Sequence, residues 1–206
     1  MRVKICGITN INDALLACEL GANALGFVFY KNSKRYIDPY EAAKIIVQLP
    51  PFVTAVGVFV NSTIDEINLI EEISGIDFIQ LHERNENYDS GDFYKPVIET
   101  FRIKNDFNFK QLPSSQAKYL LLDSFNENEF GGTGESFDWE IIPDLFKNKI
   151  ILAGGISVDN IEQVFNKINP AAVDLSSSIE EYPGKKSDKK LKEFFKKINL
   201  LRGTKC

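Results

Sequence analysis

Short apolar runs alternate with amphipathic segments along the whole chain. The runs are rich in β-branched and aromatic residues and are largely apolar on both faces, as parallel strands are when helices cover them. They predict eight strands, at Val3–Cys6, Ala24–Phe29, Ala55–Val60, Phe78–Leu81, Val97–Phe101, Tyr119–Asp123, Ile150–Ala153 and Ala172–Leu175.

The segments between these runs repeat their apolar residues with helical spacing. Helices are expected at Asn12–Leu20, Tyr40–Gln48, Ile64–Ile73, Ile141–Phe146, Asn160–Ile168 and Lys189–Ile198. Thr9 or Asn10 is a suitable N-cap for the first helix, and Gly21 is suited to end it. The connections Arg84–Tyr94 and Ile103–Ala117 are polar and poorly periodic, so we expect weak or missing helices after strands 4 and 5.

Eight strands that alternate with helices favour an α/β fold, a single (β/α)8 TIM barrel that spans residues 1–206 as one domain. A doubly wound open sheet is the alternative. That fold usually has fewer strands and a phosphate-binding G-x-G-x-x-G motif after the first one. Here the first turn is Cys6-Gly7-Ile8-Thr9, which lacks the motif, so the barrel is preferred.

The composition is that of a globular protein, with 44% hydrophobic and 26% charged residues among 206. A net charge of −5 argues against a nucleic-acid partner, and the lysines of 185–197 are expected on the solvated face of a last helix. No signal peptide or long apolar run is present, so we expect a cytoplasmic protein without a membrane partner. Cys6, Cys18, Cys206 and the lone His82 match no zinc motif, which predicts reduced thiols and no metal.

Barrel enzymes build their active sites from the loops after the C-terminal strand ends. After strand seven, Gly154 and Gly155 let a ligand approach the backbone closely. After strand eight, Ser176, Ser177 and Ser178 resemble the opening of a short extra helix, whose free N–H groups attract anions. These loops therefore predict a phosphate site, although the glycines can also be only a turn and the serines only a cap.

Reactive side chains stand at other strand ends. Cys6 ends the first strand and Asp123 ends the sixth, so in a barrel they supply an acid and a base for proton transfer. Arg35, in the loop after strand two, is suited to grip a planar carboxylate. Taken singly, Cys6 can be a small buried hydrophobe, Asp123 a residue that ties down its own loop, and Arg35 a surface arginine.

Ten short segments match one known family in order from one end of the chain to the other. They are Lys4–Thr9, Gly21–Phe29, Ser33–Tyr36, Val56–Asn61, Gln80–His82, Gly131–Gly134, Phe137–Trp139, Gly154–Ile156, Val173–Ser177 and Pro183–Lys185. Each segment is weak alone. In this combination, the chain resembles the phosphoribosylanthranilate isomerases of tryptophan biosynthesis.

The resemblance implies a barrel that performs, without a cofactor, the Amadori rearrangement of N-(5-phosphoribosyl)anthranilate to 1-(2-carboxyphenylamino)-1-deoxyribulose 5-phosphate. It implies Asp123 as general acid, Cys6 as general base and Arg35 as the anchor of the anthranilate carboxylate. The glycines and serines of loops seven and eight would hold the phosphate, and His82 is either a lining of the aromatic end of the substrate or a structural residue. The implied partner is this small phosphorylated substrate, and the chain is expected to be a monomer or homodimer.

A cysteine base raises a physical difficulty, because a free thiol has a pKa of about 8.5 and is mostly protonated near neutrality. The strand period of two places Lys4 on the same inward side as Cys6. A buried ammonium needs a partner, and strand eight, beside strand one in a barrel, offers Asp174. We therefore predict a Lys4–Asp174 ion pair under the site, with Lys4 lowering the pKa of Cys6.

Three positions depart from the family pattern. Glu83 and Ser178 stand where Gly is usual, which costs stability if either position needs positive φ, and Glu135 stands where Lys is common. Two other functions stay open, a non-catalytic barrel that binds a phosphorylated ligand and another sugar-phosphate isomerase or epimerase. The retention of Cys6 and Asp123 together favours the phosphoribosylanthranilate isomerase.

Overall fold

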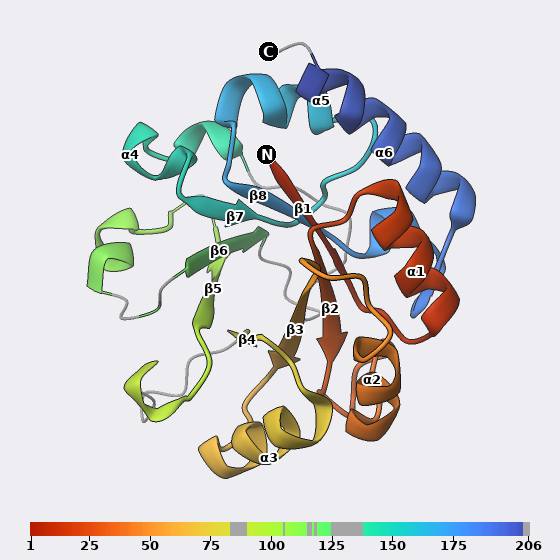
Figure 1. Cartoon of the computed structure of the whole chain (residues 1–206). Helices are drawn as coiled ribbons and strands as arrows, with labels where there is room; N and C mark the ends of the chain where they lie inside the picture. The colour runs from red at the N-terminus through yellow and green to blue at the C-terminus, as the bar shows by residue number, and fades with distance from the viewer. Residues whose placement is uncertain (83–89, 105, 115–116, 118, 125–137, 204–206) are drawn as a thin grey trace.

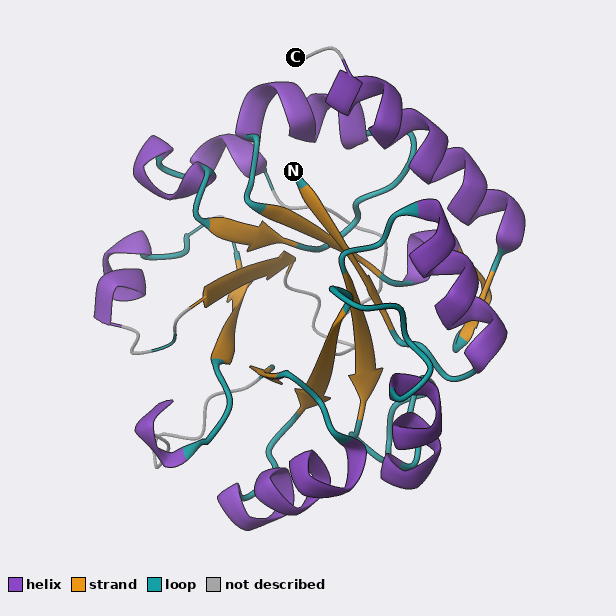
Figure 2. Cartoon of the chain, viewed as in Figure 1, coloured by secondary structure: helices purple, strands orange, loops and turns teal. Residues whose placement is uncertain are grey.

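Eight parallel strands close into a barrel in the order β1 to β8, and β8 pairs with β1. The computed structural model describes residues 1–82, 90–104, 106–114, 117, 119–124 and 138–203. Helices surround the ring of strands on the outside (Figures 1 and 2). The predicted (β/α)8 barrel is confirmed, and its closure excludes the open sheet that was the alternative.

The strands lie where the apolar runs place them, with ends that differ from the prediction by at most two residues. They are β1 (Arg2–Cys6), β2 (Ala24–Val28), β3 (Thr54–Phe59), β4 (Phe78–Leu81), β5 (Val97–Ile103), β6 (Tyr119–Ser124), β7 (Ile150–Leu152) and β8 (Ala172–Leu175). In the pairing of β1 with β8, Lys4 stands opposite Asp174.

Helices occupy the predicted connections. They are α1 (Ile11–Leu20), α2 (Pro39–Ile46), α3 (Ile64–Ser74), α4 (Asp144–Lys147), α5 (Ile161–Gln163) and α6 (Asp188–Gly203). A 3₁₀ turn at Trp139–Ile141 precedes α4, and α5 continues as a π-helical turn over Val164–Ile168. In the described parts of the connections after β4 and β5, the helical segments are the 3₁₀ turns Ser90–Asp92 and Phe109–Ser114, as the poor periodicity predicts.

Helix α1 shows how the local sequence sets an element boundary. Asn10 is the N-cap and its side chain accepts a hydrogen bond from the backbone N–H of Asp13. Gly21 ends the helix in the left-handed region, with a φ of 109°. Among the described residues, no helix is long and apolar enough to cross a membrane.

The segment after β8 differs from the prediction. The expected short helix is a single 3₁₀ turn at Ser177–Ile179, and an antiparallel hairpin follows, formed by β9 (Glu180–Tyr182) and β10 (Lys185–Lys186). The prediction that the lysines of 185–197 cover a solvated helix face is wrong for Lys186, which precedes α6 and is only 1% exposed. Its ammonium is instead paired inside the protein.

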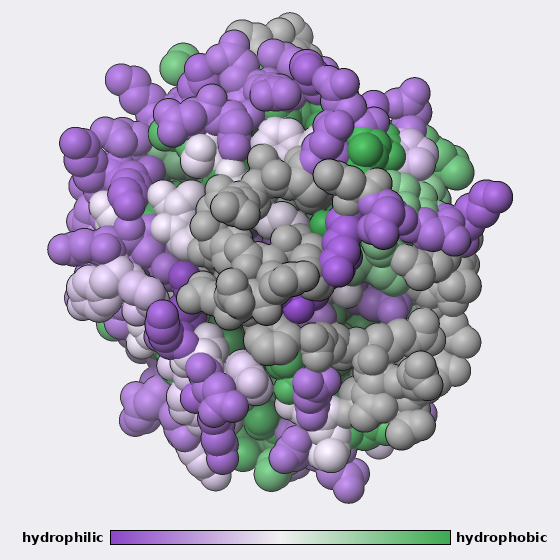
Figure 3. Space-filling model, turned by 180° about the vertical axis from the view of Figure 1, so that it is seen from behind, coloured by the Kyte–Doolittle hydropathy of each residue, from purple (hydrophilic) through white to green (hydrophobic). Residues whose placement is uncertain are grey.

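Apolar side chains form two clusters. The larger one fills the space between the barrel and its helices, and the smaller one, inside the barrel, contains Val56, Ile98, Leu121 and Ala153. Hydrophilic residues dominate the periphery of the face seen in Figure 3, with small apolar areas between them. The barrel interior is therefore packed beneath the strand ends, which leaves these ends free to form a site.

Candidate active site

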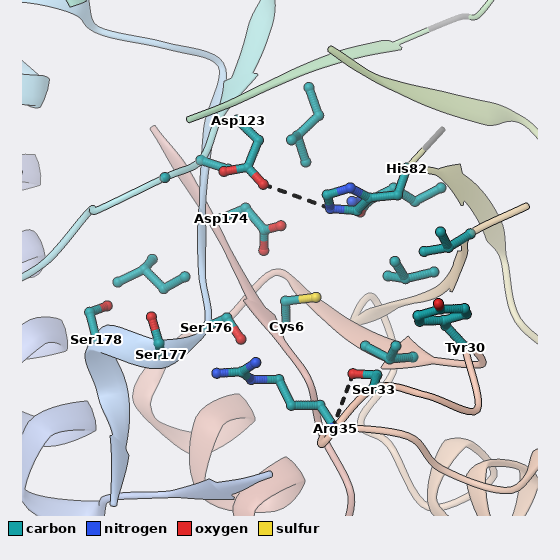
Figure 4. A pocket seen from close by; sticks show the side chains of 18 of the residues that line it. Cys6, Tyr30, Ser33, Arg35, His82, Asp123, Asp174, Ser176, Ser177 and Ser178 are labelled. Carbon is teal, nitrogen blue, oxygen red and sulfur yellow. Dashed lines mark hydrogen bonds and ion pairs between the residues drawn. The ribbon is translucent and has the colours of Figure 1, made fainter. Parts of the chain in front are cut away.

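A cavity of about 280 Å³ opens at the C-terminal ends of the strands. Small-molecule sites begin at about 300 Å³. All the predicted site residues except Lys4 line it, together with Val28, Tyr30, Asn32, Ser33, Lys34, Val58, Val60, Gln80, Leu121, Ala153, Ile156 and Leu175. Figure 4 shows Asp123 and His82 on one side, Cys6 and Arg35 on the other, and Asp174 between them. The fold thus brings residues from distant parts of the chain to one cavity.

Asp123, at the end of β6, is buried beside His82. Their closest atoms, Asp123 Oδ2 and His82 Nε2, are 3.7 Å apart. Burial, reinforced by the charge of Asp174, raises the pKa of Asp123 to about 6. Burial lowers the pKa of His82 to about 4, so this imidazole is neutral near pH 7 and does not hold Asp123 in its ionised form. Asp123 is therefore suited to give up a proton.

Cys6 lies above the predicted ion pair. Lys4 Nζ donates to Asp174 Oδ2 at 2.8 Å, and both side chains are buried, so the predicted pairing is confirmed. Gly26 on β2 makes room for the group, because a Cβ at Gly26 would lie 2.8 Å from Cys6 Sγ and 3.1 Å from Lys4 Nζ. The thiol and the ammonium therefore share one small space inside the barrel.

Lys4 lowers the pKa of the Cys6 thiol, as predicted, but other influences on this pKa outweigh it. Burial raises the pKa of the Cys6 thiol and is the largest cause, while the charge of Lys4 lowers it. Asp174 raises it again, and Lys186 adds a second lowering charge. The net pKa stays above the ordinary value in this structure, so the two cations limit the cost of the thiolate without making it the ground state.

Arg35 lies at the mouth of the cavity, where its stem covers Gly7. A Cβ at Gly7, whose φ is +77°, would lie 2.7 Å from Arg35 Cδ. The alternative that Arg35 is only a surface arginine does not hold, because its Nε and Nη2 donate to the Glu180 carboxylate at 2.8 to 3.1 Å. A carboxylate of the protein therefore fixes one edge of this planar cation.

Loops seven and eight bring backbone to the cavity. Gly154 and Gly155 have φ values of +82° and +66°, and a Cβ at Gly154 would lie 2.4 Å from Ser124 Oγ. Ser176, Ser177 and Ser178 also line the cavity, close to Arg35 in the view of Figure 4. Only one 3₁₀ turn follows, so the anion site predicted here depends on loop N–H groups and hydroxyls rather than on a longer helix.

The departures from the family pattern have separate outcomes. Ser178 is not among the described non-glycine residues with positive φ, so the replacement of Gly brings no backbone strain there. Glu83 and Glu135, like the Gly131–Gly134 segment, lie outside the described residues.

Sequence reasoning missed several residues of the site. Tyr30, Asn32 and Gln80 line the cavity without having been candidates, and Glu180 and Lys186 approach it from the hairpin. The Pro-Gly pair between β9 and β10 is a turn signal that would have revealed the hairpin. In the part of the chain that the structure describes, no three His, Cys, Asp or Glu side chains are grouped to hold a metal ion.

Comparison with known proteins agrees with this geometry. Residues 3–197 match the family model described as N-(5'phosphoribosyl)anthranilate (PRA) isomerase. The N-(5'-phosphoribosyl)anthranilate isomerase of Geobacter sp. (strain M21) is 43% identical over 201 residues, which cover 97% of this chain and 98% of that protein.

Solved structures of the same name have the same fold. The phosphoribosyl anthranilate isomerase from Thermus thermophilus is 38% identical, with a TM-score of 0.90 over 98% of this chain and 100% of that one. A second isomerase, solved in complex with reduced 1-(o-carboxyphenylamino)-1-deoxyribulose 5-phosphate, is 35% identical with a TM-score of 0.83, and the match covers 97% of this chain and 98% of that one.

Proposed function

This chain belongs to the N-(5'-phosphoribosyl)anthranilate isomerase family, and we propose that Asp123 and Cys6 carry its reaction. The enzyme is an aldose–ketose isomerase of tryptophan biosynthesis that converts N-(5-phosphoribosyl)anthranilate to 1-(2-carboxyphenylamino)-1-deoxyribulose 5-phosphate. The main support for the proposed roles is that the two groups reach one cavity from strands on different sides of the barrel.

Asp123 acts first, as the general acid. It protonates the furanose ring oxygen, so the C1–O bond breaks and the nitrogen lone pair forms an iminium at C1. A pKa of about 6 keeps roughly a tenth of Asp123 protonated at pH 7, far more than an ordinary carboxyl group.

Cys6 acts second, as the general base. Its thiolate removes the proton from C2, which the adjacent iminium acidifies, and the electrons of the C2–H bond form the enolamine. Protonation of C1 and loss of the enol proton then give the ketone. The iminium is the electron sink, so the residues of this chain need only move protons.

The remaining lining residues hold the ends of the substrate. Arg35 has a guanidinium at the cavity mouth and binds the anthranilate carboxylate. Gly154 and Gly155, with the three serines of loop eight, bind the phosphate. His82 is neutral and packs at the aromatic end, where a charged imidazole would have to be desolvated.

Fluorescence tests the function directly. Purified protein should accelerate the loss of fluorescence of freshly prepared phosphoribosylanthranilate. The Asp123→Asn protein should not accelerate this loss, but it should still bind reduced 1-(o-carboxyphenylamino)-1-deoxyribulose 5-phosphate. No acceleration by the wild-type protein would leave a phosphate-binding barrel as the better description. Acceleration by the wild type that Asp123→Asn retains would keep the isomerase and remove Asp123 from its role.

We further propose that the enzyme works in the cytoplasm, without nucleic acid, as a monomer or homodimer. The net charge of −5 supports the absence of a nucleic-acid partner. Sedimentation equilibrium distinguishes the two assembly states, and a larger assembly would contradict the proposal.

A further inference from the structure

The β9–β10 hairpin carries a buried carboxylate between two cations. Glu180 is 4% exposed and accepts hydrogen bonds from Arg35 and, at 2.8 Å, from Lys186 Nζ. Burial raises the pKa of Glu180, but the hydrogen bond from Arg35 and the charge of Lys186 outweigh it and lower the pKa overall. Glu180 is therefore ionised and able to hold both cations.

Each of the two cations also reaches a part of the active site. Arg35 lines the cavity, with its stem packed over Gly7. Lys186 Nζ donates to the backbone oxygen of Cys6 at 2.5 Å. A single carboxylate thus links the guanidinium at the mouth to the strand end that carries the thiol.

The hairpin is held in place independently of Arg35. Asp13 of α1 accepts a hydrogen bond from the backbone N–H of Lys186 at 2.7 Å and forms an ion pair with Lys185. The Thr9 hydroxyl donates to the carbonyl of Gly184 in the hairpin turn. The backbone N–H of Gly184 also donates to Glu180 Oε1 at 3.3 Å, so the position of Glu180 has supports other than Arg35.

We propose that Glu180 is a positioning residue, which aims Arg35 at the substrate carboxylate and, through Lys186, keeps the Cys6 thiol directed at the C2 proton. This inference rests on the roles of Arg35 and Cys6 proposed above. The charges agree with it, because two cations and one carboxylate leave one positive charge, which a single substrate carboxylate balances.

Kinetics of single variants separate the two proposed effects of Glu180, on Arg35 and, through Lys186, on Cys6. Glu180→Gln should raise KM about tenfold and also lower kcat, because both Arg35 and Cys6 lose their fixed geometry. Lys186→Met should lower kcat about tenfold while KM stays within about twofold, since Arg35 keeps its carboxylate partner. Glu181→Gln, at the exposed neighbour on β9, is the matched control and should leave both constants unchanged. An unchanged KM in Glu180→Gln would overturn the proposal.

A double variant shows whether Glu180 acts through Arg35. Arg35→Ala should raise KM by itself, and adding Glu180→Gln should raise it no further, because the group that Glu180 positions is already gone. If the two changes multiply in KM, Glu180 acts by another route and the inference is wrong. A normal KM in Arg35→Ala would instead refute the proposed role of Arg35, so the two failures are distinguishable.

A second double variant excludes a role in stability alone. Glu180→Gln leaves the buried Lys186 and the partly buried Arg35 without a counter-charge and can reduce the folded fraction, whereas Glu180→Gln with Lys186→Met removes one charge of each sign. The double variant should regain thermal stability but keep the raised KM. Recovery of wild-type KM along with stability would show that Glu180 only balances charge, and would overturn the inference.

Discussion

The acid and base sides of the cavity bury their ionisable groups in different surroundings. On the base side, Cys6 lies near the cations Lys4 and Lys186, both of which are paired with carboxylates. On the acid side, Asp123 faces a neutral His82 at 3.7 Å. The base side is a network of paired charges, whereas on the acid side the nearest ionisable neighbour of Asp123 is a neutral imidazole.

Burial favours the catalytic role of Asp123 and opposes that of Cys6. It raises the pKa of both groups, because the charged form of each is an anion. A raised pKa helps Asp123, which must hold a proton, and hinders Cys6, which must lose one. The cations are therefore needed near the base, whereas at Asp123 the lowering effect of Arg102 and Lys4 is smaller than the raising effect of burial, so its pKa stays above the ordinary value.

Asp123→Asn should produce the largest change, with opposite signs in activity and stability. Loss of the general acid should lower kcat by about 10² to 10⁴-fold. The raised pKa means that ionising Asp123 destabilises the folded state, a cost absent below about pH 4 and complete above about pH 6. The variant should therefore be more stable by up to about 3 kcal/mol at pH 8, as measured by urea unfolding.

The same measurement at low pH is the control for that prediction. Below pH 4 both the folded and unfolded states carry a protonated Asp123, so the difference in unfolding free energy between wild type and variant should shrink. A difference that does not change with pH would show that Asp123 is not the titrating group on the acid side.

Cys6→Ser should lower kcat by about 10² to 10⁴-fold with little change in KM, because a hydroxyl is a far poorer source of an anion than a thiol. Steady-state fluorescence kinetics measure both constants. Cys18→Ser is the matched control, since Cys18 lies in α1 and does not line the cavity. Equal losses in the two variants would remove Cys6 from its role as base.

Gly26→Ala tests whether the base side depends on close packing. The new methyl group would meet Cys6 Sγ at 2.8 Å and Lys4 Nζ at 3.1 Å, so one or both must move. We expect kcat to fall about tenfold or more from misplacement of the thiol. Gly203→Ala, where a Cβ meets nothing within 4 Å, is the control and should keep full activity. Full activity in Gly26→Ala would show that the site tolerates a displaced thiol.

Lys4→Met should have the smallest kinetic effect and the clearest titration. Removing the charge that lowers the Cys6 pKa should move the pH profile of thiol alkylation by iodoacetamide to higher pH. Adding Asp174→Asn removes a charge that raises the same pKa, so the profile should return part of the way. An alkylation profile that is unchanged in Lys4→Met would mean that Lys4 does not tune the thiol.

The sequence predicted the barrel and much of the lining of its site for one reason. Parallel strands buried on both faces read as continuous apolar runs, and the fold places the residue after each run at one end of the barrel. Cys6, Asp123 and His82 could be placed in this way, and the Lys4–Asp174 contact followed from the strand period and closure of the barrel.

Other features depended on contacts that no local pattern encodes. Lys186 belongs to a lysine-rich stretch that reads as solvent-exposed, yet it is buried because Glu180 and the Cys6 carbonyl surround its ammonium. For the β9–β10 hairpin, the Pro-Gly pair is a local signal of the turn, but the contact of Asp13 in α1 with Lys186 that holds the hairpin against the barrel comes only from the fold.

By itself, the sequence determined which side chains stand at the strand ends and in what order, because strand periodicity is a local property of the chain. Only the tertiary structure decided how those side chains are protonated and aimed. The pKa of Asp123 and the pairing of Arg35 with Glu180 follow from burial and from charges that are distant in the chain. Electrostatic energies depend on distance in space, which the fold sets and the order of residues does not.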